Sequence, residues 1–528
     1  MASWTDLTNS LLERKHIKIP IEKRFFYHFL EGDGDNIQKL HVLDELLKHG
    51  YLEDDPRLLQ LRKNLRIFVK TSTMNYEEFK YCIENHICIL HKIFRGESVI
   101  PAFSVFCKTL KTIYEDSFSY TEGHNADYIP QLARVNPEKY GLSVCTIDGQ
   151  RYNLGDTTDA FSVQSCCKPL NYGLALETKG EQCVHSYVGR EPSGQAFNEL
   201  LLNKQGIPHN PLINSGAIMT TSLLYPEKPL SDRFEALIQL WTKLSGGIYK
   251  IGFNNSVYLS EKNTADRNYA LAHFMNETTS NKPTGFPPHT NIQETLELYF
   301  QSCSLEVTTQ ILSIAAATLA NGGTNPFTGE IIFSPETVKC ILSMMLTCGM
   351  YDYSGEFAFK IGLPAKSGVS GAVMIVVPNV MGIATWSPRL DDIGNSVRGI
   401  EFCKRFGSTF GFHIFDSMAT TALDPTRHSY QSESYLLFSE LCMAASQGDL
   451  EHIKLLFNRE MDMNQCDYDG RTALHIAVAE SHYDICKFLL QVGKVNDKKK
   501  DRWGHTPLSE CTQDSIRELF QTTSIVPS

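Results

Sequence analysis

The sequence of 528 residues has no apolar run that approaches the roughly twenty residues of a membrane-spanning helix. It also lacks an excess of positive charge, because 60 acidic residues outnumber 49 lysines and arginines and give a net charge of −11. A negatively charged protein is repelled by phosphate backbones and by anionic lipid. We therefore expect neither a nucleic acid nor a membrane as a partner.

Spacings typical of zinc or redox sites are also missing, since no C-x-x-C pair and no H-E-x-x-H occurs. The 15 cysteines lie mostly in apolar periodic segments, where a free thiol acts as a small hydrophobic group. This pattern predicts a reducing, intracellular compartment and no structural metal. The first twenty residues have no apolar signal core, and Asp6 and Glu13 are unlike a transit peptide. We expect no clear targeting segment in that stretch.

The length of the chain indicates several domains. Residues 1–120 predict a helical domain, because stretches such as IQKLHVLDELLKHG space their apolar residues by three and four. The fragment EGDGDN resembles a calcium loop. Counted from Asp33, however, the sixth position is Gln38 instead of glycine, and the twelfth is Asp44 instead of glutamate. We expect an EF-hand-like bundle that binds no calcium.

In residues 121–415, strand-like runs alternate with helical stretches, which predicts an α+β domain with an antiparallel sheet. YGLSVCTIDGQ indicates a strand followed by a turn at Asp148-Gly149. AVMIVVPNVMGIATWSP indicates two strands separated by Pro378-Asn379. Helical stretches such as SLEVTTQILSIAAATLANGG lie between these segments.

Residues 416–435 are polar and aperiodic and predict a linker. Within residues 436–528, LCMAASQGDLEHIKLLF at Leu441 aligns with LHIAVAESHYDICKFLL at Leu474, an offset of 33. A 33-residue period with a T-x-L-H-like start is typical of ankyrin repeats. Such repeats form binding surfaces, so we expect this tail to have a protein partner, which the sequence does not identify.

The stretch FSVQSCCKPL places Ser165 and Lys168 on one helical turn. Pro169 favours a helix start close by, where backbone N–H groups stabilise a developing negative charge. A serine nucleophile needs a base, and burial would favour the neutral, basic form of the lysine. The adjacent Cys166 and Cys167 have diverging side chains, so we interpret them as packing inward and not as metal or redox ligands.

This motif is not specific by itself, since S-x-x-K arises about twice by chance in a chain of this length. The buried start of an ordinary helix explains it as well. A second motif, Lys366-Ser367-Gly368, opens a β-rich run. S-x-x-K hydrolases carry such a K-[ST]-G strand motif later in the chain. The order of the two motifs favours a serine hydrolase of the β-lactamase and penicillin-binding type.

Blocks throughout residues 128–415 resemble the glutaminase family. They are ADYIPQLA, VQSCCKPLNY, YVGREPSG, PHNPLINSGAI, EKNTADRNYALA, LELYFQSCSLEVT, AATLANGGTNPFTGE, CGMYDYSGEFAFKIGLPAKSGVSG and GNSVRG. With its helical N-terminal region and ankyrin repeats, the chain is similar to the phosphate-activated kidney- and liver-type enzymes of animals. The resemblance implies hydrolysis of L-glutamine to L-glutamate and ammonia through a γ-glutamyl-serine intermediate, without a metal or other cofactor. It also implies a homotetramer, inorganic phosphate as an activator and a mitochondrial location, although the first twenty residues leave the cytoplasm open.

The resemblance also implies roles for individual residues. Ser165 would be the nucleophile, Lys168 its base, Tyr351 a proton shuttle, and Tyr128 a residue of the pocket wall. The backbone N–H groups of Ser165 and Val369 would form an oxyanion hole. Ser165, Tyr351 and Val369 would also contact the substrate, together with Gln164, Asn214, Glu261, Asn268 and Tyr299. Without the resemblance, Glu261 beside Lys262 resembles a surface pair, Tyr299 a core aromatic and Asn214 a turn residue.

One segment departs from the family pattern. Gly194–Gly206 corresponds to the activation loop, and Glu199 and Leu201 stand where kidney-type enzymes carry a lysine and a phenylalanine. The difference leaves phosphate activation and inhibitor sensitivity open. Two other functions remain as alternatives: another S-x-x-K acylase of the β-lactamase type, and a catalytically inactive ankyrin scaffold.

Overall fold

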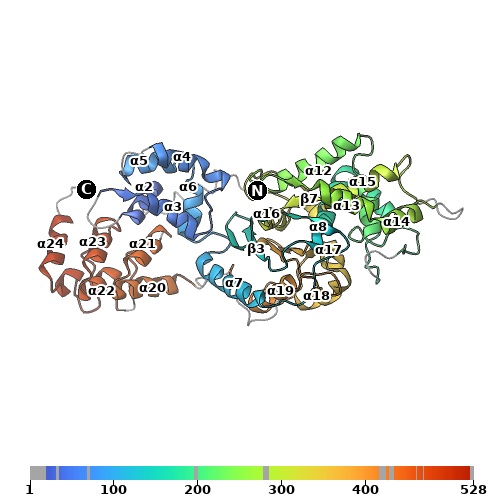
Figure 1. Ribbon diagram of the computed structural model, residues 1–528. Helices are drawn as coiled ribbons and strands as arrows, with labels where there is room; N and C mark the ends of the chain where they lie inside the picture. The colour runs from blue at the N-terminus through green and yellow to red at the C-terminus, as the bar shows by residue number, and fades with distance from the viewer. Residues whose placement is uncertain are drawn as a thin grey trace. The chain divides into compact units, whose positions relative to one another are not determined.

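The computed structural model describes residues 20–30, 35–67, 72–194, 200–277, 285–415, 424–426, 433–459, 461–467 and 469–523. The chain forms two compact units, traced in Figure 1. Unit 1 contains Met1–His49, Arg57–Ala102 and Arg427–Ser528, and unit 2 contains Gly50–Pro56 and Phe103–Thr426. No helix in the described ranges is long and apolar enough to cross a bilayer.

The N-terminal part of unit 1 is helical. Its helices are α2 (Ile21–Phe29), α3 (Lys39–Lys48), η1 (Pro56–Leu58), α4 (Leu59–Ile67), α5 (Tyr76–Ile83) and α6 (Ile87–Arg95). The short strands β1 (Ile37–Gln38) and β2 (Thr73–Met74) pair antiparallel between them. Helix α5 begins at a capping box, in which Asn75 and Glu78 each accept the other's backbone N–H. Asp33, the first position of the fragment that resembles a calcium loop, lies outside the described residues.

The C-terminal part of unit 1 stacks helical pairs. The elements are α20 (Glu433–Gln447), α21 (Leu450–Asn458), α22 (Ala473–Ala479), α23 (Tyr483–Gln491), η5 (Pro507–Glu510) and α24 (Asp514–Thr523). Leu441 and Leu474, the two aligned positions of the repeat, are both fully buried in the shared core. Within the unit, α21 packs against α2, and Lys454 Nζ on α21 donates to the Leu30 carbonyl at 3.0 Å.

Unit 2 is built on a five-stranded antiparallel sheet, which confirms the predicted α+β class. The strand order is β4 (Arg151–Gly155), β3 (Gly141–Thr146), β10 (Met381–Trp386), β9 (Ala372–Val377) and β8 (Ala365–Gly368). The predicted turns join β3 to β4 and β9 to β10. Strand β8 therefore lies at one edge of the sheet.

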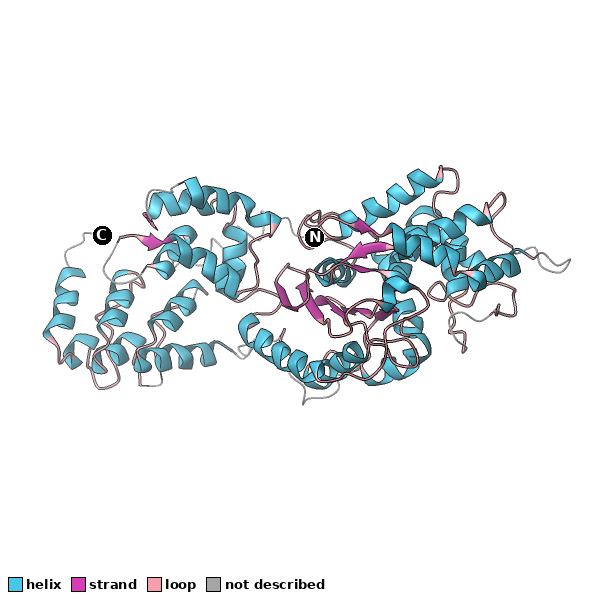
Figure 2. Cartoon of the chain, viewed as in Figure 1, coloured by secondary structure: helices cyan, strands magenta, loops and turns pink. Residues whose placement is uncertain are grey.

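Helices cover both faces of this sheet, as Figures 1 and 2 show. Helix α16 (Thr309–Ala320) crosses one face so closely that a Cβ at Gly382 would lie 2.1 Å from the Ala317 nitrogen. On the other face, Gly399 of α19 (Val397–Thr409) lies against Thr385. Gly382 and Thr385 are three residues apart on one strand, so they point to opposite faces. Helix α7 (Phe103–Phe118) packs against α19.

The remaining elements of unit 2 form a largely helical layer. A small sheet pairs β5 (Phe161–Ser162), β7 (Leu305–Val307) and β6 (Gly252–Phe253) in that order. The helices are α8 (Pro130–Ala133), η2 (Gln164–Cys167), α9 (Lys168–Lys179), α10 (Glu181–Tyr187), α11 (Asn214–Ser222), α12 (Leu230–Leu244), α13 (Asn255–Asn263), α14 (Asp266–Asn276), α15 (Ile292–Cys303), α17 (Pro335–Cys348), η3 (Tyr351–Tyr353) and α18 (Ser354–Lys360). This layer meets the sheet where η2 packs against the edge strand β8.

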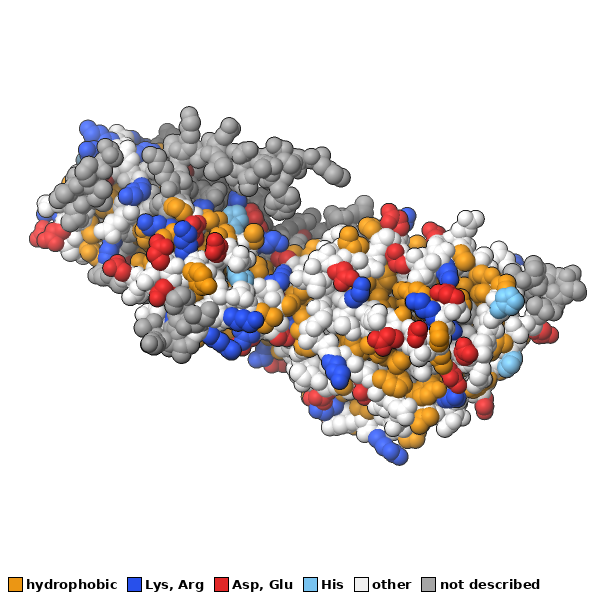
Figure 3. Space-filling view, turned by 90° about the horizontal axis from the view of Figure 1, so that it is seen from above, with side chains coloured by type: hydrophobic (Ala, Val, Ile, Leu, Met, Phe, Trp, Pro, Cys, Tyr) orange, Lys and Arg blue, Asp and Glu red, His pale blue; other side chains and the backbone are white. Residues whose placement is uncertain are grey.

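Two further features concern the surface and the linker. In the face shown in Figure 3, acidic and basic side chains are interspersed with apolar ones. Most of the predicted linker, 416–435, lies outside the described residues.

Candidate active site

The candidate nucleophile lies at the start of a helix, as the sequence predicts. The backbone N–H of Val163 donates to the Leu305 carbonyl at 2.8 Å and fixes the end of β5. The next residue, Gln164, has a φ of 48°, a left-handed conformation that costs energy for a residue with a side chain. Ser165 then occupies the second position of η2, and the chain continues into α9 with Pro169 in its first turn.

The candidate base is buried and bonded to an amide. Lys168 is 2% exposed, and its Nζ donates to Asn214 Oδ1 at 2.7 Å. Asn214, the first residue of α11, in turn donates from Nδ2 to Asn268 Oδ1 at 3.1 Å. Burial is the main cause that lowers the pKa of Lys168 below its usual value. The site therefore makes the ammonium form of Lys168 less favourable than it is in water.

A single carboxylate gathers two other predicted residues. Glu261 is buried on α13, and its Oε1 accepts from the Tyr128 hydroxyl at 2.7 Å and from Gln164 Nε2 at 2.9 Å. Burial raises the pKa of Glu261, while these two hydrogen bonds and the charge of Lys168 oppose that rise. The carboxylate and the lysine are thus close enough to influence each other's charge.

Two tyrosines, Tyr351 and Tyr299, are the remaining predicted polar residues of the site. Tyr351 begins η3 with a φ of 52°, and its hydroxyl oxygen is buried. Burial raises the pKa of this hydroxyl to a value well above that of a tyrosine in water, and the neighbouring Ser165 side chain opposes that rise. Tyr299 on α15 is 5% exposed. Burial is the main cause that raises the pKa of Tyr299, and the thiols of Cys303 and Cys167 and the Glu261 carboxylate raise it further.

Val369 follows directly after β8 and packs on Ile129, Leu132 and Val257. A Cβ added to the preceding Gly368 would lie 3.2 Å from the Val163 carbonyl oxygen, so the end of β8 lies directly against the start of η2. The ten predicted site residues therefore come from many elements and surround one region. Leu201 of the expected activation segment is 39% exposed, and Glu199 lies outside the described residues.

Three buried cysteines lie beside this site, and the sequence predicted the burial of two of them. Cys166 and Cys167 are fully buried, which confirms their inward packing, whereas Cys303 was not predicted. The Cys167 thiol contacts the Ser302 hydroxyl at 3.7 Å, and the neighbouring Cys303 of α15 is the main cause that lowers the pKa of Cys167. The four-residue spacing from Tyr299 to Cys303 was the available signal, because it puts both on one helix face. The K-S-G motif identifies Lys366 in the sequence but assigns it no role.

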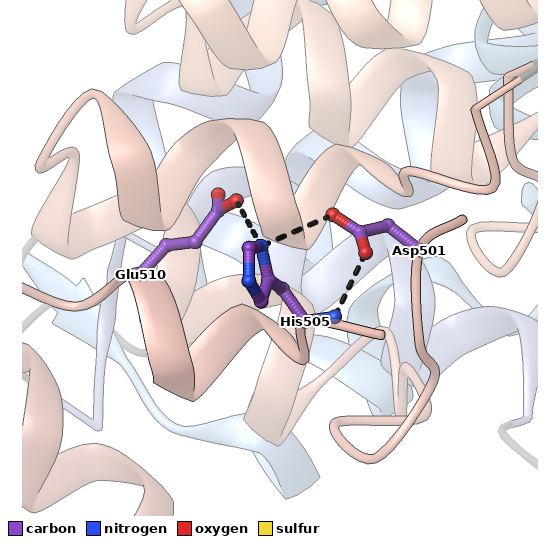
Figure 4. Close-up of side chains that lie close together, drawn as sticks. All are labelled: Asp501, His505 and Glu510. Carbon is purple, nitrogen blue, oxygen red and sulfur yellow. Dashed lines mark hydrogen bonds and ion pairs between the residues drawn. The ribbon is translucent and has the colours of Figure 1, made fainter. Parts of the chain in front are cut away.

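A second titratable cluster lies in the ankyrin repeats, where His505 stands between Asp501 and Glu510 (Figure 4). Asp501 Oδ1 accepts the backbone N–H of His505 at 2.8 Å and of Trp503 at 2.9 Å, which shapes the turn. The Glu510 carboxylate already pairs with Arg471 at 2.6 Å. These contacts make the cluster a turn-stabilising ion network, and its donors do not form a dedicated metal cage.

Comparison with known proteins agrees with the geometry. Residues 123–415 match the glutaminase family, 441–523 match ankyrin repeats in three copies, and 21–101 match an EF-hand domain. The mitochondrial liver isoform of glutaminase from Rattus norvegicus is 44% identical, over 94% of this chain and 82% of its own length. A glutaminase of Nostoc sp. is 44% identical over 60% of this chain and 92% of its own. The solved structure of Mglu in its glutamate form has a TM-score of 0.54 and 34% identity, and covers 58% of this chain and 68% of its own.

The antiparallel sheet between helical layers, with a serine and a buried lysine at its edge, defines an amidohydrolase with a β-lactamase-like fold. The chain belongs to the glutaminase family and carries C-terminal ankyrin repeats. The resemblance drawn from the sequence is confirmed.

Proposed function

We propose that this protein hydrolyses L-glutamine to L-glutamate and ammonia through a γ-glutamyl ester on Ser165. The observation that carries the proposal is the environment of Lys168. Its amine is buried one helical turn from Ser165, and its hydrogen-bond partner is the amide oxygen of Asn214 and not a carboxylate. A lysine in such a site loses its proton readily and can act as a base near neutral pH.

In the first step, the Ser165 oxygen attacks the side-chain amide carbon of glutamine while the neutral amine of Lys168 takes the hydroxyl proton. The tetrahedral intermediate then collapses, the carbon–nitrogen bond breaks, and the leaving nitrogen receives a proton and departs as ammonia. Tyr351, whose buried hydroxyl is close enough to Ser165 for the serine to affect its pKa, is suited to pass this proton from the lysine to the leaving group.

In the second step, water attacks the ester carbon and gives a proton to Lys168. The carbon–oxygen bond to Ser165 breaks, the serine oxygen recovers a proton, and glutamate is released. Both tetrahedral intermediates carry a negative oxygen. The backbone N–H groups of Ser165 and Val369 are its proposed donors, because β8 ends against the start of η2 and the first N–H groups of a helix have no intrahelical acceptor.

The proposed partners of the α-ammonium and α-carboxylate groups of glutamine follow from the charges of the side chains at the site. Glu261 is the proposed partner of the α-ammonium, through Oε2, because Tyr128 and Gln164 both donate to Oε1. Asn268 and Tyr299 are the proposed donors to the α-carboxylate, since neutral donors bind it without burying a second charge. Asn214 lies between Lys168 and Asn268 and is the proposed guide for the amide. That Mglu is described with glutamate supports a site of this kind.

Assembly, regulation and location belong to the same proposal. We propose a homotetramer, activation by inorganic phosphate, no cofactor in the chemistry, and a protein partner for the ankyrin repeats. The mitochondrial name of the rat relative supports a mitochondrial location.

The test is ammonia release by the purified full-length chain. We expect glutamine to be hydrolysed, asparagine to be a poor substrate, and phosphate to raise the rate. Hydrolysis of a chromogenic β-lactam without hydrolysis of glutamine would favour the other S-x-x-K acylases. No ammonia from glutamine, even at high phosphate, would favour the inactive scaffold.

A further inference from the structure

Lys366, the lysine of the K-S-G motif, is completely buried on the edge strand β8. Its Nζ donates to two backbone carbonyls, that of Ser367 at 2.6 Å and that of Gly349 at 3.1 Å. The same nitrogen lies 4.5 Å from the centre of the Tyr351 ring. Burying an ammonium group away from water is costly, so these three contacts compensate only in part for its desolvation. The position therefore calls for an explanation beyond packing.

The carbonyl oxygen of Gly349 links Lys366 to the segment that precedes Tyr351. It accepts from Lys366 Nζ and from the Ser367 backbone N–H, each at 3.1 Å. A Cβ at Gly349 would lie 1.8 Å from the Ala365 carbonyl oxygen, so the chain here lies directly on β8. Lys366 thus ties the end of helix α17 to the edge of the sheet.

The turn that follows is strained and carries Tyr351. This residue has a left-handed φ of 52°, which persists in a tyrosine only where the surroundings hold it. Ser354 Oγ supports one side by donating to the Tyr351 carbonyl at 2.6 Å and accepting the Met350 N–H at 2.9 Å. Lys366 supports the other side through Gly349 and the ring face.

We propose that Lys366 is a positioning residue, which holds the Gly349–Tyr351 turn and the Tyr351 ring so that the tyrosine hydroxyl lies beside Ser165. The inference rests on the proposed function, because it assumes that Tyr351 takes part in the chemistry at Ser165. Lys366 acts through the tyrosine and does not touch the substrate.

Neighbouring groups affect the charge of Lys366. Burial and the positive charge of Lys168 lower the pKa of Lys366 to about 7, and Cys166, Cys167 and Cys348 raise it. Its amine donates to the carbonyls in either protonation state, whereas attraction to the ring requires the charged form. The hydrogen bonds therefore hold the turn across the pH range, and the ring contact weakens as the pH rises past neutral.

The test is a double-mutant cycle on the full-length chain with Lys366→Met and Tyr351→Phe. We expect Lys366→Met to lower kcat for glutamine about 10- to 100-fold and to change KM less than about threefold. In the Tyr351→Phe background, the same substitution should lower kcat less than about threefold, because the hydroxyl that it positions is gone. Lys366→Gln, which keeps N–H donors without a charge, should fall between wild type and Lys366→Met.

Equal losses of kcat in both backgrounds overturn the inference, while glutamine hydrolysis by Ser165 and Lys168 stands. A Tyr351→Phe variant as fast as wild type overturns it also. If Lys366→Met and Lys366→Gln both fail to give a folded protein, as judged by thermal melting, the lysine serves stability alone and the inference is wrong. A crystal structure of Lys366→Met provides a readout independent of activity. We expect the Tyr351 hydroxyl to move away from Ser165, and an unmoved hydroxyl contradicts the inference.

Discussion

Lys168 and Asn214 form a buried pair in which Nζ donates to Oδ1 at 2.7 Å. An amide oxygen satisfies the amine without adding a negative charge, whereas a carboxylate would stabilise the ammonium form. Burial therefore outweighs the neighbouring groups that raise the pKa of Lys168, and the net effect lowers it. The pair supports the proposed role of Lys168 as the base.

Changing Asn214 to aspartate should reverse this effect. The proposed mechanism requires neutral Lys168, so it predicts that kcat/KM rises as the pH climbs through the pKa of the lysine, which burial lowers. A carboxylate in place of the amide favours the ammonium, raises this pKa, and should move the rising limb of the profile to higher pH by about one to three units. The measurement is kcat/KM for glutamine from pH 6 to 10.

A control for this profile is Asn153→Asp, on β4 at the opposite edge of the sheet from β8. It adds the same charge far from the lysine and should leave the limb in place. An unmoved limb in Asn214→Asp would contradict the assignment of Lys168 as the base.

Removing the nucleophile or the base should abolish turnover without unfolding the chain. Ser165→Ala and Lys168→Ala are each expected to lower kcat by at least about a thousandfold, because each takes away one member of a unit that acts together. Lys243→Ala, which breaks an exposed pair with Glu330, is the matched control and should keep wild-type kcat. Loss of soluble protein in both Ser165→Ala and Lys168→Ala would instead indicate a purely structural helix start.

Glu261→Gln tests the proposed partner of the α-ammonium. We expect kcat/KM for glutamine to fall about a hundredfold, mainly through KM, since a buried charge pair is lost. For an analogue of glutamine without the α-amino group, the same substitution should change kcat/KM little. The control is Glu297→Gln, which breaks a partly buried pair with Lys262 at 2.6 Å. An equal penalty with both substrates would show that Glu261 supports the site without binding the ammonium.

Deleting residues 441–528 should leave catalysis largely in place. Among the residues that the structure describes, the hydrophobic core around Ser165 and Lys168 is built from residues between Phe161 and Trp386 and includes none from the repeats. The truncated chain should lose solubility, because α2 loses the packing of α21 and the Lys454 hydrogen bond to Leu30. We expect kcat within about threefold of the full chain, measured by ammonia release. Complete inactivation would show that the repeats shape the site.

Local sequence signals predicted much of the fold. The turns at Asp148-Gly149 and Pro378-Asn379 separate the strands of the sheet as expected, because glycine and proline restrict where a strand can continue. The repeat offset of 33 likewise predicted the helical pairs of the tail.

The site was less accessible to such reasoning. Gln164 and Glu261 lie 97 residues apart in sequence, and Lys168 and Asn214 lie 46 apart, so only the resemblance to a family could group them. The left-handed backbone of Tyr351 had no local signal, because nothing in its neighbours demands that conformation. The K-S-G motif was visible, but its contact with the Gly349 carbonyl depends on tertiary packing.

The most direct test of the central claim is covalent labelling with a diazo-ketone analogue of glutamine, followed by peptide mass spectrometry. The account predicts one label per chain, on the oxygen of Ser165, with glutamate protecting the site and Lys168→Ala reacting far more slowly. A label on Cys166, Cys167 or any other side chain, with Ser165 unmodified, would contradict it.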